Sequence, residues 1–290
     1  MGASMNKKAK ITLTNSNARL IPSNASVRHH KPISALNLSS ISQNSNTHIT
    51  RGNRPVGVMP SEVLRNQVRQ ALLSNDGMNS EQLRLRMVER LKQKHDIHDE
   101  RVLKAMLRVH RHLFMDSGMA IRAYDDAALP IGYGQTISMP SVVARMISVA
   151  IAGRHAGKVL EIGSGCGYQA AVLACVFDEV YSIERIAGLY ELAKRNMAKM
   201  ADLTKVNLVL GDGMLGLPGQ GPFDAIVVAA AGLEIPKALF YQLSIGGRLI
   251  APEGDTQQRL VLLERTGPQT WDRTELEETR FVPLCSGILR

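Results

Sequence analysis

The sequence contains few of the residues that mark secreted, metal-binding or membrane proteins. Its 290 residues include three cysteines, one tryptophan and 4% aromatic residues. The cysteines (Cys166, Cys175 and Cys285) have no metal-ligand spacing, and their small, odd number is typical of a reducing compartment. The longest apolar run, 225–231, is far shorter than the roughly 20 residues of a membrane-spanning helix. We therefore expect a cytoplasmic protein with no metal site and no membrane partner.

The positive charge of the chain is concentrated near one end. The net charge is +9, yet residues 1–80 hold ten Lys and Arg against two acids, while residues 81–290 hold 25 against 24. The first 80 residues are rich in Ser and Asn and cannot bury enough apolar surface to offset their ordering entropy. They also lack the apolar core of a secretory signal. We expect a disordered tail over 1–80, with a short helix at 61–73, and a nearly neutral folded domain over 81–290 that does not bind nucleic acid.

A glycine-rich stretch is the most informative part of the folded domain. The pattern Glu161-x-Gly163-x-Gly165-x-Gly167 follows an apolar run and precedes a helical pattern, which predicts a strand, a tight turn and a helix. Glycine has no Cβ, so a ligand can approach the backbone of such a turn closely. Glu184 ends a second apolar run, at a distance where an acid can accept hydrogen bonds from both ribose hydroxyls. The two features together predict a bound nucleoside cofactor.

The glycine spacing separates two classes of cofactor. The dinucleotide fingerprint is G-x-G-x-x-G, but here the third glycine comes one residue early and the bulky Tyr168 follows it. The pattern is instead similar to the first motif of methyltransferases that use S-adenosyl-L-methionine. Asp212, after the apolar run 206–210, could accept a hydrogen bond from the adenine amino group. The spacing therefore disfavours a nicotinamide-dependent oxidoreductase.

Predicted strands and helices alternate from residue 159 onward, and two helices, at 81–94 and from Asp99, precede them. This alternation predicts an α/β fold with a doubly wound, mostly parallel sheet, Rossmann-like, with crossover helices. Residues 81–140 would supply N-terminal helices and an irregular loop (124–140), and residues 141–290 the cofactor-binding sheet. Because ligands bind beyond the carboxyl ends of parallel strands, three acids should meet there: Glu161, Glu184 and Asp212. The predicted strands are 159–162, 179–183, 206–210, 223–229 and 247–252, with antiparallel strands at 259–265 and 279–282, and the predicted helices are 168–176, 187–199 and 235–242.

Several segments resemble the bacterial protein-L-isoaspartate O-methyltransferases. The likeness covers residues from about Glu81 to the C-terminus, and its most specific part is Gly134-Gln-Thr-Ile-Ser-Met-Pro140. The other matching segments are 128–133, 159–168, 182–186, 211–213, 222–226, 246–247 and 280–284. The resemblance implies methyl transfer from S-adenosyl-L-methionine to the free α-carboxylate of an isoaspartyl residue, which begins its repair. Isoaspartyl proteins and peptides would be the partners.

The same resemblance assigns the site. It implies that Ser138 is the active-site residue, one that orients the substrate carboxylate by a hydrogen bond and is not a covalent nucleophile. The alternative role for Ser138 is to cap the helix that follows Pro140. The residues predicted to bind the cofactor are Thr136, Ile137, Glu161, Gly163, Gly165, Glu184, Arg185, Asp212 and Gly213.

The chain also departs from the family. The usual Val-Thr-Ala-Ala-Pro after the fourth strand is here Val228-Ala229-Ala230-Ala231-Gly232, and Cys166 replaces a common serine. Loss of the threonine hydroxyl leaves open a cofactor-binding protein without turnover. A methyltransferase acting on another carboxylate or small molecule is a further alternative. A nucleic-acid methyltransferase is disfavoured, because 229–232 lacks the polar-Pro-Pro-aromatic motif of enzymes that methylate base amino groups.

Overall fold

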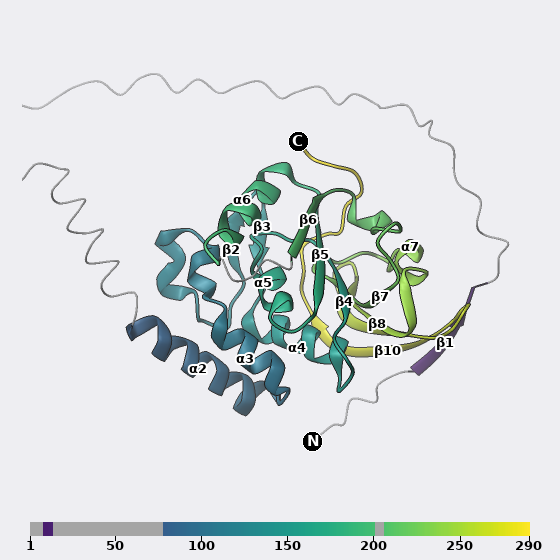
Figure 1. Ribbon diagram of the computed structural model, residues 1–290, viewed down its shortest axis with the longest axis horizontal. Coiled ribbons are helices and arrows are strands. Elements are labelled where there is room, and N and C mark those ends of the chain that lie inside the picture. The colour runs from purple at the N-terminus through teal and green to yellow at the C-terminus, as the bar shows by residue number, and fades with distance from the viewer. Residues whose placement is uncertain (1–7, 14–77, 201–205) are drawn as a thin grey trace, which may run out of the picture. The chain divides into compact units, whose positions relative to one another are not determined.

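The computed structural model describes residues 8–13, 78–200 and 206–290 (Figure 1). Most of the expected tail, including the helix expected at 61–73, lies outside these residues. Within them, an eight-stranded sheet has the order β1-β10-β9-β8-β7-β4-β5-β6. No helix of this described part is long and apolar enough to cross a membrane, and no three His, Cys, Asp or Glu side chains in it are grouped to hold a metal ion.

Five neighbouring strands of the sheet are parallel, as the sequence predicts, so the doubly wound fold is confirmed. The chain enters at β4, adds β5 and β6 on one side, and then returns to place β7 on the other side of β4. This reversal creates a switch point at the carboxyl end of β4, where open α/β sheets bind ligands. The parallel strands are β4 (Lys158–Ile162), β5 (Glu179–Glu184), β6 (Val206–Leu210), β7 (Phe223–Val228) and β8 (Leu243–Gly254).

Helices cover both faces of the sheet, because successive side chains of a strand point to opposite faces. Val159 belongs to a buried cluster beneath the helices that precede and follow β4, and its neighbour Leu160 belongs to a second cluster around Trp271 and Phe240. The helices are α2 (Met78–His95), α3 (Glu100–Arg108), α4 (Pro140–Ile151), α5 (Tyr168–Ala174), α6 (Ala187–Met197) and α7 (Lys237–Phe240), with 3₁₀ turns η2 (Arg111–Phe114), η3 (Ser117–Arg122) and η4 (Gly213–Leu215).

The structure differs from expectation at the end of the chain. The closing antiparallel strands are β9 (Gln258–Gly267) and β10 (Thr270–Thr279), so the strand expected at 279–282 is wrong. Residues beyond Thr279 form isolated bridges with other segments and no strand. Val282 is apolar for a different reason than membership in a strand: its carbonyl accepts from the N–H of Ala231 and its side chain lines the cavity at the carboxyl edge of the sheet.

Three further strands, β1, β2 and β3, were not expected at all. Strand β1 (Lys8–Thr12), inside the stretch expected to be a disordered tail, pairs antiparallel with the outer edge of β10, where Ile11 packs on the second cluster. The irregular loop before α4 contains a small hairpin of β2 (Leu129–Gly132) and β3 (Gln135–Ile137). The φ angles of Gly132, Tyr133 and Gly134 in its turn are 91°, 54° and 68°. Glycines adopt this region easily and favour a tight hairpin turn, although the flanking residues have no alternating apolar pattern.

Candidate active site

The glycine-rich turn lies at the switch point, between β4 and α5. Its three alternate glycines, Gly163, Gly165 and Gly167, have φ of 91°, 55° and 89°, a region that side chains with a Cβ rarely adopt. The turn is anchored to the next strand, because the backbone N–H groups of Gly163 and Ser164 donate to the carbonyl of Ile183 at 2.8 and 3.1 Å. The predicted strand, turn and helix are therefore confirmed, and the backbone of the turn lines a cavity.

Glu184, at the end of β5, lines the same cavity and is 5% exposed. Its Oε2 accepts from the N–H of Gly165 at 2.8 Å, and its Oε1 accepts from the N–H of Ile186 at 2.9 Å. Each carboxylate oxygen keeps a further lone pair for a ligand. Glu184 therefore fixes the glycine turn and remains available to accept hydrogen bonds from a diol.

Glu161, at the end of β4, is fully buried and does not line the cavity. Its Oε2 accepts a hydrogen bond from the Ser182 hydroxyl, which in turn lies 2.5 Å from the hydroxyl of Ser164. Its Oε1 has no partner among the described residues. Burial raises the pKa of Glu161 to about 8, and the Ser182 hydroxyl and the Gln169 amide oppose this rise only partly. Glu161 thus lies behind the glycine turn and not on the surface of the cavity, where the sequence predicted it.

The raised pKa of Glu161 predicts how stability changes with pH. Because the folded state holds this proton more tightly than the unfolded chain, the contribution of Glu161 to the free energy of unfolding is complete below about pH 4.5 and is lost as pH rises through about 8. Glu161→Gln, which cannot ionise, should therefore gain in melting temperature relative to the wild type as the pH rises from 6 to 9. Parallel melting-temperature curves for the two proteins would contradict this prediction.

Asp212, after β6, is used within the fold. Its Oδ1 accepts from the N–H of Met214 at 2.9 Å and begins η4, and its Oδ2 accepts from the N–H of Gly287 at 2.7 Å. Asp212 does not itself line the cavity, but its neighbour Gly213 does. A Cβ at Gly213 would collide with the side chain of Ile162, so glycine is needed there to bring η4 against β4.

The β2–β3 hairpin forms one wall of the cavity and supplies Thr136 and Ile137. It contacts the opposite wall at two points. The Ile131 side chain lies 3.2 Å from the place where Gly165 would carry a Cβ, and the Tyr133 ring occupies the space where Gly188, in the first turn of α6, would carry one. The hairpin therefore covers the glycine turn and partly closes the cavity from solvent.

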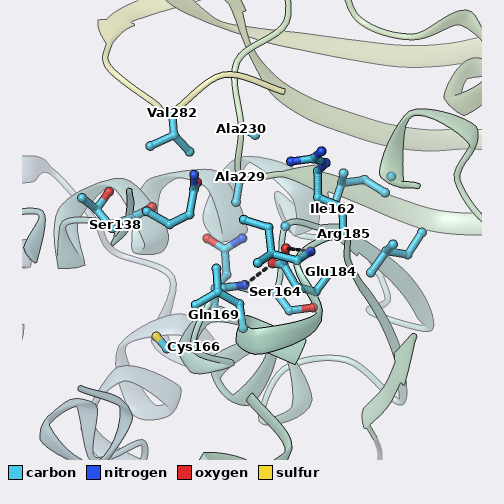
Figure 2. A pocket seen from close by; sticks show the side chains of 18 of the residues that line it. Ser138, Ile162, Ser164, Cys166, Gln169, Glu184, Arg185, Ala229, Ala230 and Val282 are labelled. Carbon is cyan, nitrogen blue, oxygen red and sulfur yellow. Dashed lines mark hydrogen bonds between the residues drawn. The ribbon is translucent and has the colours of Figure 1, made fainter. Parts of the chain in front are cut away.

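Ser138 connects β3 to α4 and lines the cavity from the hairpin side, half-buried. It does not cap the helix, because α4 begins at Pro140 with Met139 as N-cap and no side-chain bond from that residue. The N–H of Ser141 is instead bonded to Asp126 Oδ1 at 2.9 Å. In Figure 2, Ser138 and Glu184 lie on opposite sides of the cavity, with Gln169 between them.

A C-terminal segment, residues 280–290, crosses the carboxyl edge of the sheet and completes the site. Leu284 N–H donates to the Ala231 carbonyl at 2.7 Å, and Leu289 N–H donates to the Arg185 carbonyl at 2.8 Å. The Arg185 guanidinium donates to the carbonyls of Gly287 and Ser286 at 3.0 and 3.3 Å, so its side chain holds this segment. Residues 282–285 line the cavity. No site role was predicted for this segment from the sequence, although its likeness to the family at 280–284 was a signal.

The cavity has a volume of about 320 Å³, within the range of small-molecule sites. Its walls are mainly apolar, and the polar groups on them include Glu184, Gln169, Ser138 and the backbone of the glycine turn. Of the ten predicted site residues, Glu161 and Asp212 support the cavity from behind, and the structure brings the other eight to its surface. These eight are Thr136, Ile137, Ser138, Gly163, Gly165, Glu184, Arg185 and Gly213.

Known proteins are similar to this chain in sequence and in fold. Residues 82–288 match the family described as protein-L-isoaspartate(D-aspartate) O-methyltransferase (PCMT). The protein-L-isoaspartate O-methyltransferase of Bordetella parapertussis is 58% identical over 245 residues, which are 84% of this chain and 92% of that protein. The enzyme of the same name from Bordetella petrii is 63% identical over 214 residues, which are 74% of this chain and 79% of that protein.

Two solved structures have the same architecture. One is a protein-L-isoaspartate O-methyltransferase that is 31% identical, with a TM-score of 0.64 over 71% of this chain and 67% of that chain. The other, from Plasmodium falciparum, is assigned to the same enzymes and is in complex with S-adenosyl-L-homocysteine; it is 25% identical, with a TM-score of 0.60 over 69% of this chain and 96% of that chain. The chain belongs to the protein-L-isoaspartate(D-aspartate) O-methyltransferase family.

Proposed function

We propose that this protein transfers a methyl group from S-adenosyl-L-methionine to the free α-carboxylate of L-isoaspartyl residues in damaged proteins and peptides. The observation that carries the proposal is a half-covered cavity at the switch point, in a member of this family, with Glu184 on one side and Ser138 on the other. The product ester then collapses to a succinimide, which reopens partly to normal aspartate.

The residues at the cavity suit the cofactor. Glu184 can accept from both ribose hydroxyls while it holds the glycine turn, whose bare backbone allows close approach. Gly213 and the apolar walls at Ile137 and Leu189 would flank the adenosine. We assign Asp212 and Glu161 to shaping this surface from behind, and Thr136, Ile137 and Arg185 to enclosing the cofactor from the hairpin and the C-terminal segment.

The reaction needs alignment more than acid–base chemistry. The substrate carboxylate has an unperturbed pKa near 4 and is already ionised at neutral pH. The bound cofactor supplies a methyl group on a sulfonium. The protein must hold the carboxylate in line with that methyl and exclude water, and positioning of this kind can supply about 7–11 kcal/mol. Ser138 would donate a hydrogen bond that orients the carboxylate, with help from backbone N–H groups of 136–138.

The absence of the family threonine predicts a gain from restoring it. Ala229 lines the cavity beside Gly163, with its Cβ 3.6 Å from the place of a glycine Cβ. Ala229→Thr should raise kcat/KM for an isoaspartyl peptide by about threefold to tenfold, since one neutral hydrogen bond contributes about 1 kcal/mol. Ala229→Val, which has the same shape without the hydroxyl, is the control and should show no gain. Equal effects of the two variants would contradict a role for the hydroxyl.

Transfer of labelled methyl groups tests the proposed function. An isoaspartyl peptide should gain label from S-adenosyl-L-methionine, and the same peptide with normal aspartate should not. Label in neither peptide, together with binding of S-adenosyl-L-homocysteine, would favour a methyltransferase for another carboxylate or small molecule, or a binding protein without turnover. We further propose that the enzyme works in the cytoplasm, that nucleic acid is not its partner, and that residues 81–290 suffice for the reaction.

A further inference from the structure

Gln169 is a buried polar residue of the cavity that no predicted role includes. It lies in the first turn of α5, two residues after the last glycine of the turn, and is 7% exposed. Neither its Oε1 nor its Nε2 makes a hydrogen bond of normal geometry among the described residues, although the amide lies near enough to Glu161 to lower the pKa of that carboxyl slightly. A buried amide without hydrogen-bond partners destabilises the folded state, so a folded protein rarely keeps one without a reason.

The other buried polar side chains at the cavity are already paired. Ser164 bonds to the hydroxyl of Ser182, Tyr168 donates to Met106 Sδ at 3.6 Å, and Glu184 accepts from two backbone N–H groups. Within the described part of the chain, Gln169 is thus the buried lining residue whose side-chain oxygen and nitrogen both make no hydrogen bond. Behind it, Glu161 Oε1 is also unpaired.

The chemistry of the cofactor supplies both groups that this amide needs. The amino-acid end of S-adenosyl-L-methionine carries an ammonium, which only donates, and a carboxylate, which only accepts. A carboxamide can accept from the first with its Oε1 and donate to the second with its Nε2. The apolar walls at Val143, Ile162 and Val282 can satisfy neither charge. Gln169 also lines the same cavity as Glu184 and Ser138, and in the view of Figure 2 it lies between them.

We propose that the Gln169 carboxamide binds the amino-acid end of S-adenosyl-L-methionine. This inference rests on the proposed function, because it assumes the cofactor. It makes Gln169 a residue that distinguishes the complete cofactor from fragments of it that lack the charged end.

The experiment compares two ligands by calorimetry on the full chain. S-adenosyl-L-homocysteine has the amino-acid end, and 5′-deoxy-5′-methylthioadenosine lacks it but keeps the adenosine and sulfur. Gln169→Met has nearly the same length and no amide. This variant should lower the affinity for S-adenosyl-L-homocysteine by at least about tenfold, because hydrogen bonds to charged groups are lost. Its affinity for 5′-deoxy-5′-methylthioadenosine should stay within about twofold of the wild-type value. Equal weakening of both ligands, or no weakening of either, would overturn the proposal.

The melting temperature of the ligand-free protein separates binding from a structural role. If Gln169 serves the ligand, Gln169→Met removes an unpaired buried amide, and the melting temperature should stay the same or rise. If Gln169 instead supports Glu161 in the fold, the melting temperature should fall, which would overturn the proposal. A rise in KM for an isoaspartyl peptide with unchanged cofactor affinity would also overturn it. If the wild-type protein binds S-adenosyl-L-homocysteine but methylates no isoaspartyl peptide, the proposed substrate is contradicted and the proposed role of Gln169 is not.

Discussion

Glu184→Gln is expected to weaken the binding of S-adenosyl-L-homocysteine by about 100-fold. Glu184 accepts from the N–H groups of Gly165 and Ile186, and its remaining lone pairs face the cavity. The substitution replaces one accepting oxygen by a donor that would face an N–H group or a ribose hydroxyl. Hydrogen bonds to a charged group contribute about 1.5–3 kcal/mol each, so the loss of two corresponds to two orders of magnitude or more in affinity. Calorimetric titration measures the effect.

Glu191→Gln is the matched control for Glu184→Gln. Glu191 lies on α6, where its half-exposed carboxylate pairs with Lys194 and does not reach the cavity. An exposed pair of this kind contributes little, so the variant should bind the ligand as the wild type does. If Glu184→Gln retains wild-type affinity while the protein remains folded, the ribose role of Glu184 is wrong.

Ser138→Ala is expected to lower kcat for an isoaspartyl peptide by about 10- to 100-fold and to leave the affinity for S-adenosyl-L-homocysteine unchanged. The half-buried hydroxyl lines the cavity, caps no helix, and is free to orient a carboxylate. Loss of one positioned donor removes an interaction made in the transition state, and poor alignment of reacting atoms can itself cost about 100-fold. Single-turnover methylation with saturating cofactor would measure the chemical step.

Two comparisons distinguish loss of the Ser138 hydroxyl from a disturbance of the fold. Ser138→Thr keeps a hydroxyl and should retain more activity than Ser138→Ala. The melting temperature should be similar in both variants, because Asp126 accepts from the N–H of Ser141 in the first turn of α4 and the helix does not depend on Ser138. Equal losses of kcat and of cofactor affinity in Ser138→Ala would mean that the hairpin had moved, which would contradict the assigned role.

Local patterns predicted the sheet and the centre of the site well. Positive φ at Gly163, Gly165 and Gly167 follows from the glycine spacing. Glu184 lies at the cavity because the carboxyl ends of neighbouring parallel strands meet at the same edge of the sheet. These features depend on residues that are close in sequence or fixed by strand order. The sequence alone could therefore identify them.

Features that depend on distant contacts were not predictable. The Oδ2 of Asp212 accepts from the N–H of Gly287, which is 75 residues away, and the sequence did not predict this contact. The contact of Asp212 with adenine stays a prediction. Glu161 was expected at the cavity, but the Ser182 hydroxyl holds it behind the turn. Gln169 has no distinguishing motif, and only its burial without partners revealed it. Strand β1 was missed because five alternating residues, two of them lysines, carry little signal until an edge is available for pairing.

Strand β1 changes how the basic N-terminal stretch is connected. Strand β1 pairs with β10 and belongs to the same compact unit as α2, which begins at Met78, although residues 13–77 separate the two elements in the sequence. The entropic cost of bringing two chain segments together grows only slowly with their separation in sequence, by about 0.6 kcal/mol per doubling, so this long separation adds little to the cost of pairing β1 with β10. A single proteolytic cut between residues 14 and 77 would leave β1 held by noncovalent contacts alone. Its departure would then expose the edge of β10 to pairing with other polypeptides.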